Sequence, residues 1–238
     1  MLLEIAVFNI ASALQAQSLG ADRIELCENP LEGGTTPSFG TLKLVSEMIG
    51  IPVFPIVRPR GGDFLYNDEE YEVMKADLLL CKKMGFQGAV LGLLNMDGTI
   101  DVERTKKLVT AAYPLEITFH RAFDRARNPY ESLEQVIETG CSRILTSGQQ
   151  PNVSNACELI KKLIVQADER IIILPGSGVR SSNLPKMIET GAQEFHSSAR
   201  KEKKSSMRFT VTSMAESLIH FGVDEEEIKK MKSILQSS

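Results

Sequence analysis

Arg23-Ile24-Glu25-Leu26-Cys27 alternates apolar residues with charged and thiol side chains, and the segments 117–120 (ITFH) and 194–197 (EFHS) repeat this alternation. The pattern predicts strands with one apolar face and one polar face. Charges and imidazoles that face the inside of a sheet are costly unless they are paired, bound or open to solvent. The three segments therefore indicate that a polar site is assembled inside a sheet.

The same reading, extended along the chain, predicts eight βα units. Apolar segments predict strands at 2–8, 23–27, 53–58, 89–94, 116–120, 143–147, 171–175 and 194–197. Helical periodicity predicts helices at 11–19, 41–48, 69–84, 102–112, 130–139, 156–167, 182–190 and 225–236. Glycines fall just past several of these helices, where a left-handed residue ends a helix.

Eight alternating units favour an α/β fold, a closed (β/α)8 TIM-type barrel that forms a single domain over residues 1–238. Residues 201–238 are expected to form the C-terminal loop and closing helix. A doubly wound open sheet is the alternative. The absence of a GxGxxG motif after the first strand argues against a dinucleotide-binding sheet.

Composition narrows the choice of partners. The net charge is −4 over 238 residues, with a pI near 5.6, so neither nucleic acid nor an anionic membrane is an expected partner. No apolar segment is long enough to span a bilayer, and the first residues lack a signal-peptide pattern, which predicts a cytoplasmic protein. The four cysteines form no CxxC pair and are expected to be free thiols.

In a barrel, the polar face of each strand points into the lumen. The apolar residues Ile24, Leu26, Ile117, Phe119 and Phe195 are therefore expected to face the helices. The lumen is expected to receive Glu25, Cys27, Thr118, His120, Glu194 and His196. Barrel enzymes act at the C-terminal ends of the strands, where Cys27, Arg58, His120 and His196 are placed.

Two loops are candidate anion sites. Arg58 and Arg60 precede a glycine pair in the loop after the third strand, and Asp63 follows it. Guanidiniums beside glycines can bind a carboxylate or a phosphate. The alternative is an ion pair with Asp63 that stiffens a tight turn. Gly176, Ser177 and Gly178 after strand seven, with His196 and Ser197 at strand eight, match the usual phosphate site of barrel enzymes, although Gly-Ser-Gly is also a common turn.

Acid–base chemistry is the hypothesis for a second group of residues. His120 could act as a general acid or base, with Asp124 close by in sequence and Glu25 as a partner carboxylate. The alternative is that His120 and His196 belong to a structural polar network. Cys27 is the thiol expected at the mouth, and a lone thiolate is a poor cage for a soft metal unless other ligands help.

The motifs in these segments resemble those of the CutC family. The resemblance rests on residues 21–27 (ADRIELC), 32–38 (EGGTTPS), 56–64 (IVRPRGGDF), 118–124 (TFHRAFD), 145–148 (LTSG) and 194–200 (EFHSSAR). It implies a (β/α)8 barrel, a cytoplasmic homodimer and a role in copper homeostasis through copper(I) binding. Ala6 stands where some members carry a second cysteine, and Ser177 stands where a glycine is usual.

Three functional hypotheses follow. A copper protein would use Cys27 as its thiolate, with His120 or His196 as a nitrogen ligand. A barrel enzyme would bind a small anionic or phosphorylated substrate through Arg58, Arg60 and residues 176–178, with Glu25, His120 and Asp124 transferring protons. A catalytically silent barrel would act through a protein partner.

Overall fold

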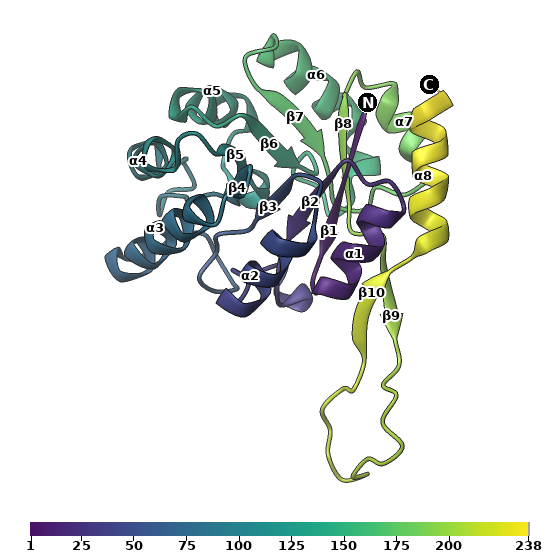
Figure 1. Cartoon of the computed structure of the whole chain (residues 1–238). Coiled ribbons are helices and arrows are strands. Elements are labelled where there is room, and N and C mark those ends of the chain that lie inside the picture. Colours follow the sequence, from purple (N-terminus) through teal and green to yellow (C-terminus); the bar gives the residue numbers. More distant parts are fainter. Residues whose placement is uncertain (238) are drawn as a thin grey trace.

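Parallel strands alternate with helices in the computed structural model, which describes residues 1–237 (Figure 1). The strands of the barrel are β1 (Leu2–Val7), β2 (Arg23–Leu26), β3 (Val53–Pro55), β4 (Gly88–Leu91), β5 (Glu116–Phe119), β6 (Arg143–Thr146), β7 (Ile172–Pro175) and β8 (Glu194–Ser197). The helices are α1 (Ile10–Ser18), α2 (Phe39–Met48), α3 (Asp68–Lys83), α4 (Val102–Ala112), α5 (Pro129–Thr139), α6 (Cys157–Ala167), α7 (Leu184–Ile188) and α8 (Glu225–Ser237). Short 3-10 turns, η1 (Pro30–Glu32), η2 (Arg121–Arg125) and η3 (Val153–Asn155), follow β2, β5 and β6.

The strands close into a ring. Two parallel sheets have the orders β3-β2-β1-β8 and β4-β5-β6-β7. They join where Ile56 bridges to Val90 beyond β3, and where β7 packs against β8. Leu2 of β1 pairs with Glu194 of β8, so the strand order around the ring follows the chain. The predicted α/β barrel is confirmed, and an open doubly wound sheet is excluded.

Local sequence sets where the helices begin. Asn9, Ser38, Asn67, Asp101 and Asn128 each accept a hydrogen bond from a backbone N–H of the first turn. Side-chain caps of this kind satisfy donors that the helix itself leaves unpaired. Of the capped helices, α1 begins directly after its strand, whereas longer loops precede α2, α3, α4 and α5, and these loops lie at the mouth of the barrel.

The two faces of each strand lie in different environments. Ile24, Ile117 and Phe195 are fully buried in the large core that the strands share with the helices. Cys27 and Phe54 belong to a separate small cluster with Ile56 and Val90 inside the ring. The predicted alternation between helix-facing and lumen-facing residues is therefore confirmed for β2, the strand on which the site depends most.

Charged side chains fill the N-terminal end of the lumen. The Arg23 guanidinium is paired with Glu4 and donates to Glu194 Oε2 at 2.6 Å, and Arg143 Nε lies 3.3 Å from the same carboxylate oxygen. The two guanidinium carbons lie 5.0 and 5.2 Å from the centre of the Phe54 ring. This network of paired charges occupies the N-terminal end of the lumen, opposite the C-terminal ends of the strands.

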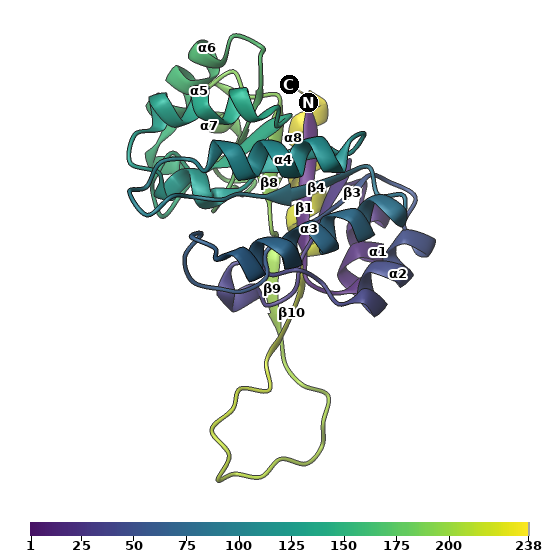
Figure 2. The same ribbon diagram turned by 90° about the vertical axis from the view of Figure 1, so that its left-hand side faces the viewer.

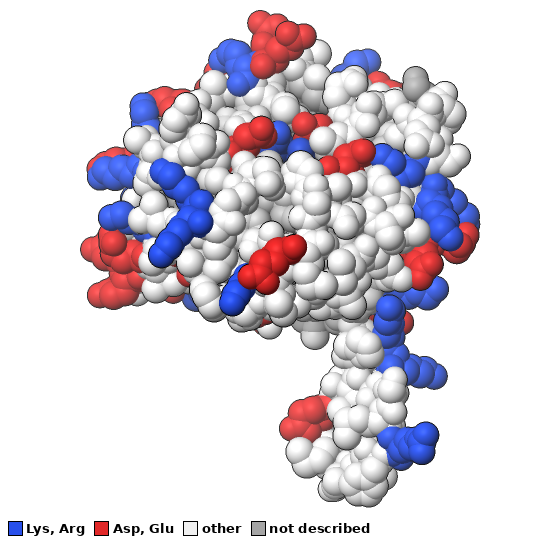
Figure 3. Space-filling model, viewed as in Figure 1, with Lys and Arg blue, Asp and Glu red and all other residues white. Residues whose placement is uncertain are grey.

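A hairpin projects from the end of β8 as an extended arm (Figures 1 and 2). It consists of the antiparallel strands β9 (Arg200–Lys203) and β10 (His220–Val223) and the exposed loop 204–219 between them. The sequence predicted only a loop here, because the charged segment 200–203 (RKEK) has no apolar alternation. Acidic and basic side chains are interspersed over the visible face of the barrel in Figure 3. Within residues 1–237, no helix is both long and apolar enough to cross a bilayer.

Candidate active site

A cavity of about 540 Å³ opens at the C-terminal ends of the strands. Residues of β1, β2, β6 and β8 and of the loops after β2, β3, β5 and β7 line it together. Among the residues predicted from the sequence, the cavity brings together Glu25, Cys27, Arg58, His120, Ser177, Gly178 and His196. The thiol, the two imidazoles and a guanidinium thus converge on one space, although they lie far apart along the chain.

A buried carboxylate–imidazole–carboxylate row forms the floor of this cavity. His196 Nδ1 lies 2.7 Å from Glu4 Oε1, and His196 Nε2 lies 3.7 Å from Glu25 Oε2. Glu4 also forms a buried ion pair with Arg23. All four side chains are at least nine-tenths buried. One imidazole therefore lies between two carboxylates, one anchored by an arginine and the other facing the cavity.

The two carboxylates have opposite pKa shifts. Burial alone would raise the pKa of Glu4, but the charge of Arg23 and the hydrogen bond with His196 lower it to about 2. Burial raises the pKa of Glu25 to about 7; the charge of His196 opposes this rise and that of Glu4 adds to it. Burial disfavours the charged form of His196, yet its hydrogen bond to Glu4 and the charge of Glu25 raise its pKa. Near neutral pH the row therefore holds a proton that it can release or accept.

His120 is a neutral hydrogen-bond donor. Its Nδ1 accepts the backbone N–H of Ala122 at 3.2 Å, so the hydrogen of the neutral ring lies on Nε2. Burial, with the nearby charge of Arg58, lowers its pKa to about 3. Nε2 is buried and has no hydrogen-bond partner. The bond that fixes the tautomer thus comes from a main-chain amide, not from Asp124 or Glu25.

Arg58 is buried without a carboxylate. Its terminal nitrogens donate to the carbonyl oxygens of Glu32, Gly34 and Gly62 at 2.6, 2.8 and 2.9 Å, while Nε has no partner. Its guanidinium carbon lies 4.9 Å from the centre of the Phe64 ring. Neutral carbonyls orient the guanidinium but leave its charge uncompensated, which is the state an anion-binding arginine requires.

Arg60 and Asp124 lie outside the cavity lining. Arg60 forms ion pairs with Asp63 at 2.9 Å and with Glu70 at 2.5 Å. These contacts fit the alternative in which Arg60 stiffens a turn, and they do not fit a role in binding an anion in the cavity. Asp124 accepts hydrogen bonds from Thr146 Oγ1 at 2.5 Å, from Ser147 and from Arg121 Nε at 2.8 Å. Asp124 joins the loops after β5 and β6 and orients Arg121, which does line the cavity.

The loop after β7 contributes only part of the predicted phosphate site. Gly176 packs under His196, where an added Cβ would lie 3.1 Å from the imidazole Cδ2. Ser197 is buried and donates its hydroxyl to Val179 O at 2.7 Å. The backbone N–H and the hydroxyl of Ser181, which precedes α7, both donate to the Glu227 carboxylate and are not available to a ligand. Ser177 and Gly178 remain at the cavity wall.

Sequence reasoning missed Glu4. The segment 2–8 (LLEIAVF) was assigned as a strand, but its single charged residue was not considered. Glu4 pairs in register with Arg23 and with His196, and the alternation predicts a lumen position for His196. A lone carboxylate inside an otherwise apolar barrel strand is the signal that would have identified it.

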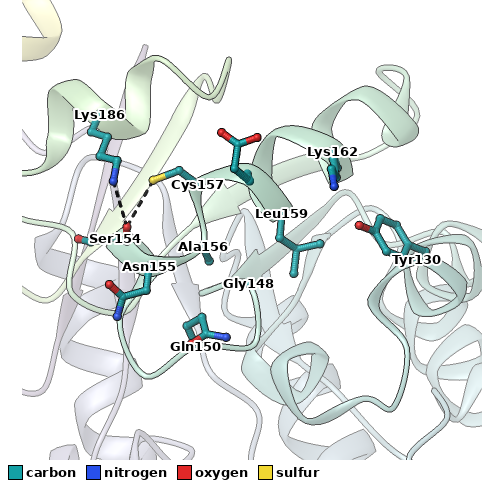
Figure 4. A pocket seen from close by; sticks show the side chains of 11 residues that line it. Tyr130, Gly148, Gln150, Ser154, Asn155, Ala156, Cys157, Leu159, Lys162 and Lys186 are labelled. Atoms are coloured by element: carbon teal, nitrogen blue, oxygen red, sulfur yellow. Dashed lines mark hydrogen bonds between the residues drawn. The ribbon is translucent and has the colours of Figure 1, made fainter.

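A second hollow, of about 420 Å³, lies at the start of α6 (Figure 4). Lys186 Nζ and Cys157 Sγ both donate to the Ser154 carbonyl oxygen, at 3.4 and 3.5 Å. Neither group has a partner that would activate it as a nucleophile or a base. Cys81 and Cys141 are buried in the core, in agreement with their expected packing role.

Comparison with known proteins identifies relatives along nearly the whole chain. A model described as the CutC family matches residues 1–201. A family protein CutC from Photorhabdus laumondii is 48% identical, and the match covers 98% of this chain and 96% of the relative. One from Proteus mirabilis is 46% identical over 98% of this chain and 96% of the relative.

Solved structures give the same result for the fold. The "Putative Copper Homeostasis Protein CutC" from Streptococcus agalactiae superposes with a TM-score of 0.79 at 33% identity, over 83% of this chain and 98% of that one. A phosphoribosylanthranilate isomerase from Thermotoga maritima has a TM-score of 0.59 at 13% identity, with both chains covered completely. At that identity the second likeness concerns the fold alone.

Proposed function

This chain belongs to the CutC family, and we propose that it is an enzyme that transfers protons to and from a small anionic molecule bound at the mouth of its barrel. The observation that carries the proposal is the buried row Glu4–His196–Glu25 below the cavity. A carboxylate with a pKa of about 7 is present in both protonation states at neutral pH, as efficient general acid–base catalysis requires.

The groups around Glu25 suit one class of reaction, removal of a proton from a carbon next to a carbonyl group. In this mechanism the ionised Glu25 carboxylate accepts the proton. His196, held by Glu4, stabilises the negative charge of Glu25 before the transfer. The negative charge that develops on the carbonyl oxygen needs a donor that is fixed in advance. His120 Nε2–H is a neutral donor without a partner, and Arg58 lies beside it.

The test is exchange of hydrogen with the solvent. The protein is incubated in deuterium oxide with phosphorylated aldehydes, ketones and keto acids, and deuterium incorporation is followed by mass spectrometry. We expect exchange into at least one compound and loss of that exchange in the Glu25→Gln variant. If no compound exchanges faster with the parent protein than with the variant, the proposal fails.

Copper binding is the second candidate, because the S. agalactiae relative bears a copper-related name and Cys27 lines the cavity. The residues present fit a copper site poorly. Burial, with the charge of Glu25, raises the pKa of the Cys27 thiol well above its usual value, so a metal ion would have to displace the thiol proton in order to bind. Within residues 1–237, no three His, Cys, Asp or Glu side chains are grouped so that they could hold a metal ion.

We therefore predict that Cys27→Ser leaves the affinity for copper(I) nearly unchanged. Anaerobic titration against a competing chelator measures this affinity, with Cys157→Ser as the control for a partly exposed thiol. A loss of about tenfold or more, equal to about 1.4 kcal/mol, for Cys27→Ser alone would place copper at the mouth and contradict the prediction. Cytoplasmic location and a homodimer stay predictions.

A further inference from the structure

Arginines without an acidic partner gather at the cavity. Five arginines have no carboxylate oxygen within 4 Å among residues 1–237: Arg58, Arg125, Arg180, Arg200 and Arg208. The first four line the cavity, and Arg208 lies in the exposed arm. Unpaired guanidiniums repel one another, so their gathering around one space indicates that an anionic ligand compensates them.

The cavity arginines form two groups. Arg58 follows β3, while Arg121 and Arg125 belong to η2 after β5. Arg58 and Arg121 are both close enough to His120 to lower its pKa, after burial as the main cause. We call Arg58, Arg121 and Arg125 the β3/β5 group.

The second group follows the last two strands of the ring. Arg180 follows β7, which lies opposite β3, and Arg180 Nη2 donates to the Arg200 carbonyl oxygen at 3.3 Å. Arg200 follows β8, and its guanidinium Nη1 donates to the Pro30 carbonyl oxygen of η1 at 3.0 Å. We call these two the β7/β8 group. In a ring whose strand order follows the chain, the arc from β3 to β5 faces the arc from β7 to β8. The positive charge is therefore divided between opposite walls.

Uncharged or proton-transferring groups lie between the walls. His120 is 4% exposed, and its Nε2 has no hydrogen-bond partner. Glu25 and His196 lie on the floor of the cavity. The lining contains two carboxylates, Glu25 and Glu32, against five guanidiniums, of which Arg121 is already paired with Asp124. A ligand with a single anionic end would leave one wall uncompensated.

We propose that the ligand carries two anionic groups, phosphate or carboxylate, held by the β3/β5 group and the β7/β8 group, with an oxygen-bearing middle over His120 and Glu25. The proposal rests on the proposed function for the reaction that follows binding. The binding geometry itself depends only on the arginines. Since two linked anions bind at an effective concentration set by their linker, a ligand of matching length should bind much more tightly than either end alone.

The test uses methylphosphonate and a series of linear alkanediphosphonates of increasing length in isothermal titration calorimetry. We expect at least one diphosphonate to bind the parent protein about tenfold or more tightly than methylphosphonate. Arg125→Ala and Arg180→Ala should each remove most of this advantage, because each weakens one wall. Arg208→Ala, which removes the same charge from the arm, is the matched control and should retain it.

Two results would overturn the proposal. One is that no diphosphonate binds the parent protein better than methylphosphonate. The other is that Arg125→Ala and Arg180→Ala affect diphosphonate binding no more than Arg208→Ala does. Tight diphosphonate binding by a protein that exchanges no solvent deuterium would keep the two-anion site and overturn only the proposed reaction.

Discussion

Glu4→Ala will lower the free energy of unfolding by about 3–5 kcal/mol, the cost of removing one partner from a buried ion pair. Glu4 is 1% exposed and holds both the Arg23 guanidinium and His196 Nδ1. Without it, Arg23 retains only Glu194, and His196 loses the acceptor that helps to raise its pKa. Arg23 stays buried against the Phe54 ring, whereas His196 keeps its contact with the cavity.

Urea denaturation at neutral pH, followed by circular dichroism, measures this loss. The control is Glu134→Ala, which breaks an ion pair with Arg170 whose side chains are 47% and 44% exposed. An exposed pair of this kind contributes about 0–1 kcal/mol. If Glu4→Ala costs no more than the control, or if Glu4→Gln is as stable as the parent, the lumen does not depend on the negative charge of Glu4 in the way described.

Glu25→Gln will lower the rate constant for proton transfer by about 10²–10⁴-fold and leave KM nearly unchanged. The amide has the shape of the carboxyl group but cannot accept the proton. Glu32→Gln is the matched control, since Glu32 also lines the cavity but is exposed and belongs to the loop after β2. Equal effects of the two variants would show that Glu25 acts only through the net charge of the cavity.

The same variant changes how stability depends on pH. The folded protein holds a proton on Glu25 up to pH of about 7, whereas the ordinary pKa of glutamate is 4.5. The folded state of the parent therefore binds more protons than the unfolded state between these values, and its stability falls as the pH rises from 4.5 to 7. Glu25→Gln has no such proton to lose. The free energy of unfolding of the variant minus that of the parent should therefore be larger at pH 8 than at pH 4.

Strand periodicity predicted the barrel because the physical cause of the pattern is local. The face of a strand on which a side chain lies follows from the position of the residue in the alternation. The sequence therefore predicts that Glu25, Cys27 and His120 face the lumen. The closing β9–β10 hairpin had no such signal, because four consecutive charged residues give no alternation.

The partners within the site could not be predicted in the same way. Which carboxylate contacts His196 depends on the stagger between β8 and β1, and the pairing of Glu4 with His196 is a property of the closed ring. Asp124 lies near His120 in sequence, yet the turn η2 directs its carboxylate to Thr146 and Ser147. Sequence proximity therefore does not give the contacts of Asp124, whereas the register of β1 and β8 gives the contact between Glu4 and His196.

The protonation state of Glu25 tests the account most directly. Carbon-13 NMR of protein labelled at the glutamate carboxyl carbon can follow its titration, with the Glu25 signal assigned by its absence in Glu25→Gln. The account predicts an apparent midpoint near pH 7 for Glu25. A Glu25 signal that titrates near the ordinary value of 4.5 would contradict the buried acid–base centre.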